Sequence, residues 1–306
     1  MPIVRRPRLL ACALLAAALA GAGCGERSEP VGALAQTYPV SVQGAGDRPT
    51  VLKAKPVRIV ALDAGSAELL AALGVGKRLV GIPSGVRIAR AAGAAETVSG
   101  TGQINVAGVI ALDPDLVVAT SATDQLDLAR LERETGAAVY VQPAASILNV
   151  EQGAIDLGVL VGAPARARQL VGRIQRRVAA IEARLQSVAP VSVFIDTGFF
   201  ITVPERSLLG DLVKRAQGKS IAGATPGPGP FPLADLRDAN PRVFLATSDS
   251  EITLAALQSN PITADVRAVR RKRLLVVPSA LVTRAGPRVA AGLEAVARAL
   301  HPDAFR

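Results

Sequence analysis

Few residues in this chain are suited to covalent or metal chemistry. Its 306 residues include one histidine, His301, and two cysteines, Cys12 and Cys24. A single histidine beside the C-terminus provides neither the ligand set of a zinc site nor a base next to a nucleophile. The segment GVGKR, residues 74–78, lacks the upstream glycine of a phosphate loop and has Arg78 where Ser or Thr binds magnesium. We therefore expect no enzyme, no cofactor and no metal ion held by the protein's own side chains.

Cys24 lies where a lipid can be attached. Three arginines, at positions 5, 6 and 8, precede an apolar segment from Leu9 to Ala20, and small residues lead from it to Cys24. The apolar segment is shorter than the roughly 20 residues that a membrane-spanning helix needs. This order is similar to that of a bacterial lipoprotein signal peptide, which is cut before a cysteine whose thiol is then acylated. The alternative is an ordinary signal peptide that is cut near Cys24.

Removal of such a signal would leave the mature chain with one cysteine. Cys12 would leave with residues 1–23, so the mature chain would keep no pair of cysteines for a disulfide. The mature protein is expected in the cell envelope, lipid-anchored to the outer face of the cytoplasmic membrane or in the periplasm.

The chain is basic, with 35 lysines and arginines against 25 acids and a formal net charge of +10. An excess of this kind can serve a phosphate-bearing partner or an anionic membrane. The positive residues are spread along the chain, the densest run being RAVRRKR at 267–273, and aromatic residues make up only 3%. Because single-stranded nucleic acids bind to clustered aromatic or arginine planes, we expect no nucleic-acid partner.

The residues best suited to bind a small molecule lie at or just after the ends of predicted strands. In parallel α/β sheets, ligands bind beyond the carboxyl ends of the strands. Three phenylalanines in predicted loops suggest an apolar wall for a large ligand, with packing in the core as the alternative. Several arginines, Arg90 among them, could face an anionic ligand or simply be exposed. The candidate ligand-binding residues are Ser66, Arg87, Gln103, Thr120, Phe199, Phe200, Phe231, Thr247 and Arg284.

Alternating strands and helices must position these residues. A short hairpin turning at 44–47 precedes a buried strand over 57–62, a helix over 64–74 that Ser66 can cap, and a strand over 78–82. This order implies parallel pairing in an α/β sheet. Further strands are predicted over 115–120, 137–142, 191–196, 242–247 and 273–278, and further helices over 123–135, 205–218 and 286–300.

One long amphipathic helix separates two similar halves. Apolar residues recur at intervals of three or four from Pro164 to about residue 187, and Pro190 prevents continuation. On either side of it, DPDLVVATSATD (113–124) and NPRVFLATSDSE (240–251) share a pattern, which two related lobes or chance would explain. We expect an α/β fold of two Rossmann-like lobes joined by one long rigid α-helix, with a ligand cleft between the lobes. The predicted parts are a signal peptide 1–23, a tether 24–37, an N-terminal lobe 38–162, an inter-lobe helix 163–189 and a C-terminal lobe 190–306.

Four segments in this order resemble the substrate-binding proteins of ABC importers for iron chelates and cobalamin. They are residues 38–82, 109–120, 207–223 and 285–302. The resemblance implies that a metal chelate is held between the lobes and that an ABC permease is the partner. Members that dock to a permease carry a glutamate on each lobe, and the matching positions here are Ala107 and Ala234. This departure puts docking in doubt, and the alternative is an envelope-anchored interaction or scaffold protein that keeps the fold.

The nature of the ligand follows mainly from exclusion. Free zinc or manganese needs several histidines and carboxylates, and haem iron needs His, Tyr, Met or Cys beside it. His301 is nearly terminal, Tyr38 lies in the predicted hairpin and Tyr140 in a predicted strand. A chelate whose metal is already fully coordinated remains. It is either a corrinoid, which suits the phenylalanines, or a ferric siderophore, which requires inward-facing arginines. The closing segment looks slightly more like cobalamin-binding members, so a corrinoid is our expectation.

Overall fold

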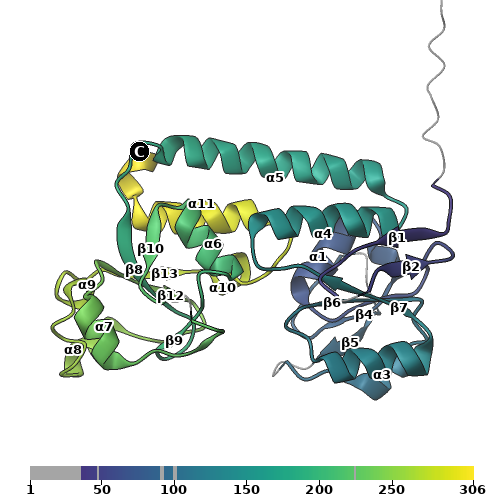
Figure 1. Cartoon of the computed structure of the whole chain (residues 1–306), viewed down its shortest axis with the longest axis horizontal. Helices are drawn as coiled ribbons and strands as arrows, with labels where there is room; N and C mark the ends of the chain where they lie inside the picture. Colours follow the sequence, from purple (N-terminus) through teal and green to yellow (C-terminus); the bar gives the residue numbers. More distant parts are fainter. Residues whose placement is uncertain (1–35, 47, 90–92, 99–101, 224) are drawn as a thin grey trace, which may run out of the picture. The chain divides into compact units, whose positions relative to one another are not determined.

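The computed structural model describes residues 36–46, 48–89, 93–98, 102–223 and 225–306 (Figure 1). The predicted signal peptide, Cys24, most of the predicted tether and Arg90 lie outside the described residues. Nothing in the described ranges forms a helix that is long and apolar enough to cross a membrane. The residues from Thr37 to Arg306 form one compact unit.

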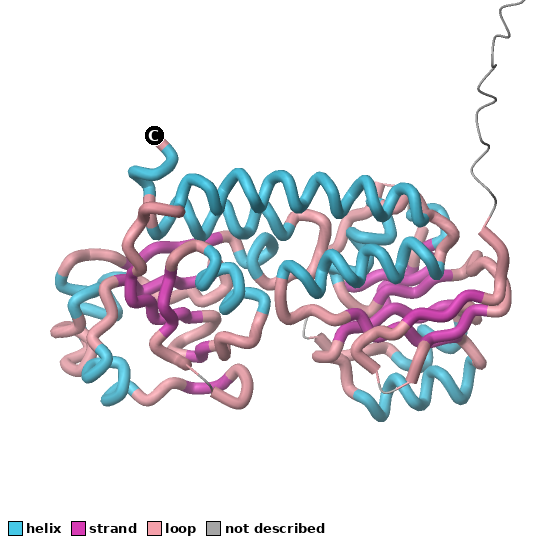
Figure 2. Tube along the Cα trace, turned by 45° about the horizontal axis from the view of Figure 1, so that its top comes forward, coloured by secondary structure: helices cyan, strands magenta, loops and turns pink. Residues whose placement is uncertain are grey.

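The N-terminal lobe comprises β1 (Val40–Val42), β2 (Thr50–Leu52), β3 (Ile59–Ala61), α1 (Ala64–Ala72), the 3-10 helix η1 (Gly76–Arg78), β4 (Leu79–Pro83), β5 (Ala95–Val98), α2 (Val106–Ala111), β6 (Leu116–Thr120), α3 (Gln125–Thr135), β7 (Ala138–Gln142) and α4 (Ile147–Leu160). Its main sheet is parallel, in the order β5-β4-β3-β6-β7. The strands β3 and β6 are buried along their whole length, as parallel strands covered by helices on both faces require. One face packs against α2 and α3, and the other against α1 and α4 (Figure 1, Figure 2).

The C-terminal lobe comprises β8 (Val191–Asp196), β9 (Ile201–Thr202), α6 (Leu208–Arg215), β10 (Gly218–Ser220), β11 (Gly229–Pro230), α7 (Leu233–Ala239), β12 (Val243–Thr247), α8 (Leu254–Ser259), α9 (Arg267–Arg270), β13 (Leu274–Val277), α10 (Ser279–Val282), α11 (Val289–Leu300) and the 3-10 helix η2 (Pro302–Phe305). Its main sheet is also parallel, in the order β10-β8-β12-β13. The helices α6 and α11 cover one face, and the segment from α7 to α9 covers the other.

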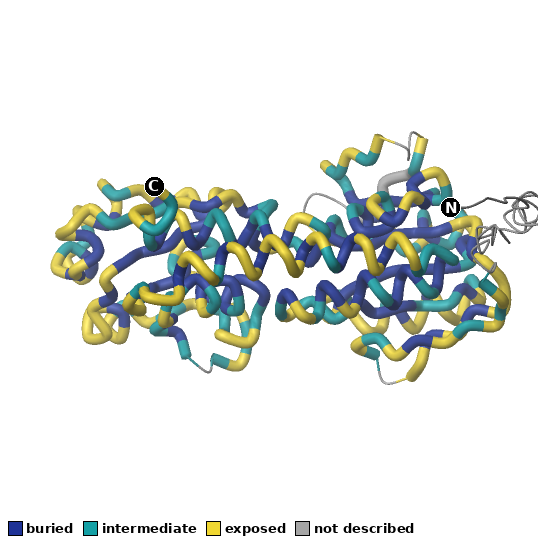
Figure 3. Tube along the Cα trace, turned by 90° about the horizontal axis from the view of Figure 1, so that it is seen from above, coloured by how far each residue is buried: buried dark blue, intermediate teal, exposed yellow. Residues whose placement is uncertain are grey.

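The long helix α5 (Pro164–Leu185) runs beside α4 of one lobe and α11 of the other (Figure 1, Figure 2). It begins with Pro164 in its first turn, where a missing N–H costs nothing. Its buried and exposed positions alternate along the rod, as Figure 3 shows. The predicted helix from 164 to about 187 is confirmed to within two residues. Its buried positions are Ala167, Leu170, Val171, Ile174, Val178, Ile181 and Leu185.

Two differences from the sequence analysis concern α1 and α4. Asp63, and not Ser66, caps α1, because the Asp63 side chain accepts from the backbone N–H of Ser66. The helix α4 was not predicted. Its buried positions include Glu151 and Asp156, which interrupt the apolar pattern and are held by hydrogen bonds from Gln175, Gln152 and Tyr140.

Candidate functional site

Seven of the nine predicted ligand-binding residues end a parallel strand or follow its carboxyl end within five residues. In each lobe these ends meet at one edge of the sheet, which we call the carboxyl edge. The exceptions are Arg284, which follows α10, and Phe231, which follows β11 but is tied to the same region because its backbone N–H donates to the carbonyl of Phe200 at 2.8 Å. The structure arranges the nine residues in separate groups.

Ser66 belongs to a buried network at the start of α1. One oxygen of Asp63 accepts from the Ser66 N–H at 2.9 Å, and the other lies 2.5 Å from Ser66 Oγ. Ser66 Oγ also lies 2.9 Å from Gln142 Oε1. Ser66 has no exposed surface, so in this structure its hydroxyl contacts protein groups and not an open face. Burial raises the pKa of Asp63 above its ordinary value of 3.8, although the hydrogen bonds from Ser66 and Gly65 act in the opposite direction.

The same network reaches the C-terminal lobe. Gln142 Nε2 donates to the carbonyl oxygen of Ala285 at 2.8 Å. A Cβ atom on Gly65 would lie 2.6 Å from that same oxygen, so a larger residue does not fit there without movement. The segment between α10 and α11 therefore lies directly on the first turn of α1, and the two lobes meet at this point.

Ion pairs of Glu68 with Arg284 and Arg288 add to this contact between the lobes. Glu68 of α1 lies 3.1 Å from Arg284 and 2.8 Å from Arg288. Arg87 lines the same cavity, of about 500 Å³, and within the described residues it has no carboxylate within 4.0 Å. The cavity lining holds three arginines and one glutamate, and so carries net positive charge. Its lining comprises Glu68, Ala71, Val86, Arg87, Ile88, Ala89, Arg284, Pro287 and Arg288.

Gln103 and Thr120 line a different hollow, of about 570 Å³, at the carboxyl edge of the N-terminal lobe. Gln103 is exposed, whereas Thr120, the last residue of β6, is 9% exposed. Asp124 and Asp127, at the start of α3, line the same hollow and offer hydrogen-bond acceptors. Neither Gln103 nor Thr120 lines the arginine-rich cavity.

The three predicted phenylalanines form one aromatic group at the carboxyl edge of the C-terminal lobe. The rings of Phe199 and Phe200 meet edge-on with centroids 6.1 Å apart. Phe200 also contacts Phe244 at 6.2 Å, and Phe231 contacts Phe194 at 5.3 Å. Phe200 and Phe231 thus pack partly into the core, which was the alternative interpretation, whereas the Phe199 side chain is exposed, at 68%.

The loop that carries Phe199 and Phe200 has an unusual backbone. Their φ angles are 45° and 67°, so two consecutive residues with large side chains adopt the left-handed conformation. Asp196, the last residue of β8, accepts from the Phe200 N–H at 2.7 Å and from the Ser250 hydroxyl, and it is fully buried. Burial raises the pKa of Asp196. Strain of this kind tends to occur at functional sites, where the surroundings hold it in place.

Thr247 packs inside the C-terminal lobe. It is the last residue of β12 and is only 3% exposed. The accessible hydroxyl beside it is that of Ser248, which is exposed and lies 3.2 Å from the hydroxyl of Ser279. In this structure Ser248, and not Thr247, presents a polar group at that strand end.

Sequence reasoning missed four residues that organise these groups: Glu68, Gln142, Asp196 and Arg288. Glu68 lies within α1 and Arg288 is the N-cap of α11, so neither lies in a loop that directly follows a strand. Asp196 did leave a signal, because a carboxylate ends the otherwise apolar strand VSVFID. Within the part of the chain that the structure describes, no three His, Cys, Asp or Glu side chains gather into a possible metal site.

Ala107 and Ala234 occupy equivalent places in the two lobes. Each is exposed and is the second residue of the helix that precedes β6 or β12. Asp235 and Asp238 are also exposed on α7, and Asp238 lies 3.1 Å from Arg237. The helix α2 has no acidic residue. The equivalence agrees with the assignment of these positions from the sequence.

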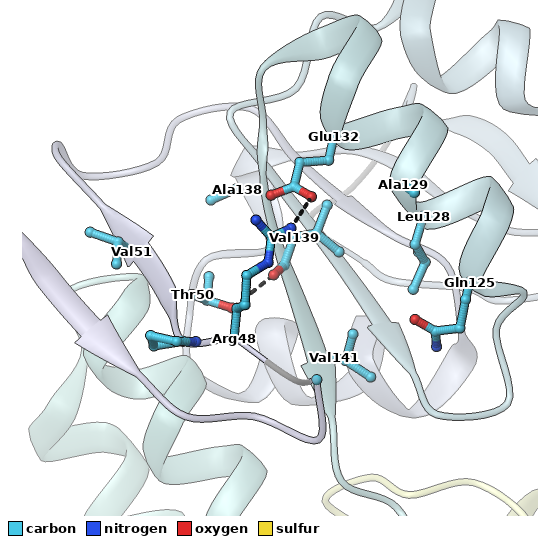
Figure 4. Close-up of a pocket in the computed structure, with 12 residues that line it drawn as sticks. Arg48, Thr50, Val51, Gln125, Leu128, Ala129, Glu132, Ala138, Val139 and Val141 are labelled. Atoms are coloured by element: carbon cyan, nitrogen blue, oxygen red, sulfur yellow. Dashed lines mark hydrogen bonds and ion pairs between the residues drawn. The ribbon is translucent and has the colours of Figure 1, made fainter.

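A further hollow, of about 340 Å³, lies between β2, β7 and α3 (Figure 4). Arg48 and Glu132 form an ion pair at 3.0 Å across it, and the Thr50 hydroxyl donates to the carbonyl of Val139 at 2.7 Å. None of the nine predicted ligand-binding residues lines this hollow. Its contacts fasten the β1–β2 hairpin to the sheet, which is a structural role.

Comparison with known proteins finds relatives over nearly the whole chain. The family model described as "Periplasmic binding protein" matches residues 59–281 and confirms the resemblance predicted from the sequence. The chain is 27% identical over 307 residues to the "Uncharacterized ABC transporter substrate-binding lipoprotein YvrC" of Bacillus subtilis (strain 168), covering 96% of this chain and 97% of that one. It is 26% identical over 251 residues to a "Cobalamin-binding protein" of Halobacterium salinarum, covering 80% of this chain and 64% of that one.

The fold is shared with solved structures. The periplasmic vitamin B12 binding protein BtuF of Vibrio cholerae matches with a TM-score of 0.71 and 20% identity, over 82% of this chain and 98% of that chain. At this identity the likeness establishes the fold alone. The predicted α/β architecture of two lobes with a long helix is confirmed.

Proposed function

The chain belongs to the periplasmic binding protein family, and from this premise we propose that it binds a metal chelate outside the cytoplasm and delivers it to an ABC importer. Members of the family are solute-binding proteins and not enzymes, as the sequence predicted. The family is one of periplasmic or extracytoplasmic proteins, which agrees with a location in the cell envelope. The cobalamin-binding relative supports a chelate as the ligand class.

The exposed Phe199 side chain is the observation that carries the choice of a corrinoid. A corrinoid presents a broad, largely apolar ring that is rimmed by amides, and such a ligand needs an apolar wall and a few polar groups. Phe199 provides an aromatic face at the carboxyl edge of one lobe, held on a strained loop by Asp196. Gln103 offers an exposed amide at the carboxyl edge of the other lobe.

The positions of the histidine and the tyrosines support a chelate over haem that is bound through its iron. Tyr140 is fully buried and donates to Asp156 at 2.9 Å. Tyr38 donates to the carbonyl of Leu160 at 2.9 Å. His301 follows α11, at the edge of the C-terminal sheet opposite the aromatic group. Each is therefore occupied or remote from the carboxyl edges.

A ferric siderophore is the second candidate ligand, because the cavity beside α1 is lined by Arg87, Arg284 and Arg288. Two of these arginines are already paired with Glu68. An anionic chelate would have to compete with that carboxylate for them, which lowers the net gain from each ion pair.

Calorimetric titration of the mature chain from Gly25 with cyanocobalamin and with a ferric hydroxamate tests the choice. We expect cyanocobalamin to bind and to raise the free energy of unfolding by about 2.7 kcal/mol at a hundredfold excess over its dissociation constant. Phe199→Ala should weaken that binding about tenfold or more, whereas Val57→Ala, an exposed apolar residue before β3, should not. Binding of the hydroxamate alone, lost in Arg284→Ala, would replace the corrinoid by a siderophore.

A scaffold protein without transport remains the second candidate function, and Ala107 and Ala234 favour it. Both docking positions are exposed but uncharged. If the chain does serve a permease, Asp235 or Asp238 must contribute to docking on the C-terminal lobe. A Cys24-anchored chain that co-purifies with a permease and loses it in Asp235→Ala/Asp238→Ala would support import. A chain that binds no chelate and no permease would support the scaffold.

Lipid attachment at Cys24 completes the proposed function. The signal-like arrangement of residues 1–24 and the lipoprotein named among the relatives support it. The full-length chain should incorporate labelled palmitate and partition into detergent. Labelling that persists in Cys24→Ala would contradict the anchor and favour an ordinary signal peptide.

A further inference from the structure

Four arginines gather at the amino end of the C-terminal sheet, opposite the carboxyl edge. Arg242 immediately precedes β12, Arg273 immediately precedes β13, and Arg267 and Arg271 belong to or follow α9. Because β12 and β13 are parallel neighbours, the residues before them lie side by side, and α9 adds its own arginines there. All four line one pocket of about 480 Å³, together with His301. The run RAVRRKR, the densest run of positive charge in the sequence, thus becomes part of a cluster that Arg242 completes from another element.

The pocket has no negative charge of its own. No Asp or Glu lines it, and within the described residues none of its four arginines has a carboxylate within 4.0 Å. By contrast, Arg284, Arg215 and Arg177 of the same unit all have such partners. Arg273 Nη2 lies 3.4 Å from the carbonyl oxygen of Leu300, which is an uncharged partner. Guanidinium groups that line one pocket without a carboxylate partner repel one another, and an anion that binds between them relieves this repulsion.

His301 adds a second, independent feature to the same pocket. Its Nε2 is buried and has no hydrogen-bond partner in the described structure. Burial is the largest effect on the ring and lowers its pKa, although backbone groups of Gln217 and Ala216 act in the opposite direction, so the neutral ring, which has one acceptor nitrogen, is favoured. A hydrogen-phosphate group, which carries both negative oxygens and an acidic O–H, matches guanidinium donors and such an acceptor together.

We propose that this pocket is a binding site for a phosphate-bearing anion, separate from the site of the chelate. One guanidinium group can donate two parallel hydrogen bonds to two oxygens of a phosphate. Several guanidinium groups around one pocket therefore favour a ligand with two or more negative charges on its phosphates. The ligand is either a free phosphorylated solute or the phosphate headgroup of an anionic lipid. Its place at the amino end of the sheet leaves the carboxyl edges of both lobes free for the transported solute.

The experiment measures anion affinity of the full chain by calorimetry and thermal shift, with pyrophosphate and with dispersed dihexanoyl phosphatidic acid, whose headgroup is a phosphomonoester, as probes. Arg267→Ala/Arg271→Ala removes two charges from the pocket, and Arg173→Ala/Arg176→Ala removes two exposed charges from α5 as a matched control. We expect binding in the wild type and the control, and a loss of about tenfold or more in the pocket variant. Arg242→Ala, on another element, provides a second test if the double variant unfolds.

The two probes distinguish the source of the phosphate. Tighter binding of pyrophosphate assigns the pocket to a soluble phosphorylated ligand, and tighter binding of the lipid assigns it to a membrane headgroup. The proposal is overturned if neither probe binds, or if the pocket variants and the α5 control lose affinity equally, because the interaction would then reflect only the net charge of the chain.

Discussion

The Ser66 hydroxyl has one proton but lies close to two oxygens, Asp63 Oδ2 at 2.5 Å and Gln142 Oε1 at 2.9 Å. The amide nitrogen of Gln142 is engaged with the carbonyl of Ala285, so Oε1 must face Ser66. A protonated Asp63 supplies the second proton that these two short contacts need. It donates to Ser66 Oγ, and the Ser66 hydroxyl in turn donates to Gln142 Oε1. Burial favours this neutral form, since it raises the pKa of the Asp63 carboxyl.

Asp63→Asn should therefore preserve the network at every pH. The amide oxygen can still cap α1, and the amide nitrogen can donate to Ser66 as the protonated carboxyl does. In the wild type, the contribution of Asp63 to the free energy of unfolding should fall as pH rises from about 3.8, the ordinary value, through the raised folded pKa, and stay low above it. We expect the variant and the wild type to have similar melting temperatures near pH 3 and the variant to be more stable near pH 7. A variant that is less stable near pH 7 would show that the ionised carboxylate of Asp63, and not its neutral form, stabilises the network.

The surroundings of Gly65 leave no room for a side chain, whereas those of Gly172 do. Gly65→Ala places a Cβ within 2.6 Å of the Ala285 carbonyl oxygen, so we expect a loss of about 1–3 kcal/mol in the free energy of unfolding. Gly172→Ala, inside α5, meets only Arg176 at 3.5 Å and should gain up to about 1 kcal/mol from helix propensity. Denaturant unfolding of both variants checks the pair. Equal effects of the two substitutions would mean that the two lobes are not held together at Gly65.

The places of the candidate residues near the strand ends were predictable from the sequence, whereas the partners that distant elements supply were not. The exposure of Phe199 and Gln103 follows from their places in loops at the carboxyl edges. The pairing of Arg284 with Glu68 joins residues 216 positions apart, and no local pattern shows it. Burial of Thr247 and Ser66 depends on how tightly the next element packs over the strand end, which their neighbours in the sequence do not reveal.

At the scale of elements, the loop between β8 and β9 combines a strained backbone with an exposed aromatic side chain. In the left-handed region, a side chain with a Cβ costs about 1–2 kcal/mol relative to glycine. We expect Phe199→Gly to be more stable than Phe199→Ala by about 1 kcal/mol in thermal unfolding, although both lose the ring. Both variants should lose affinity for cyanocobalamin. If Phe199→Ala is the more stable of the two, the loop is not strained at φ 45°.

Most elements of both sheets were predicted because their residues are continuous apolar runs. The strands β6, β8 and β12 read as buried strands and proved to be so. The helix α4 was not predicted because its buried polar residues interrupt the apolar pattern. Hydrogen bonds from β7, from α4 itself and from α5 satisfy these residues in the folded protein. Prediction from local periodicity fails where tertiary partners satisfy polar groups inside a core.

At the scale of the whole unit, one apolar core runs through both lobes. A single cluster of buried residues contains Ile59 and Val118 of one sheet, Val193 and Leu245 of the other, and the buried stripe of α5. The carbonyl of Ala285 and the ion pairs of Glu68 add polar contacts between the lobes. If one of two lobes that share a core unfolds, apolar surface on the other lobe becomes exposed to water.

We therefore expect the two lobes to unfold together. Ile174, 3% exposed on α5, is central to the shared core, and Ile174→Ala should lower the free energy of unfolding by about 2–5 kcal/mol. The two tyrosines, Tyr38 and Tyr140, both report on the N-terminal lobe, whereas calorimetry reports on the whole chain. Both measurements should give one melting temperature, shifted equally by Ile174→Ala and unchanged by Leu126→Ala, whose side chain is 81% exposed. Two calorimetric transitions, only one of them followed by the tyrosines, would show instead that α5 joins two lobes that fold independently.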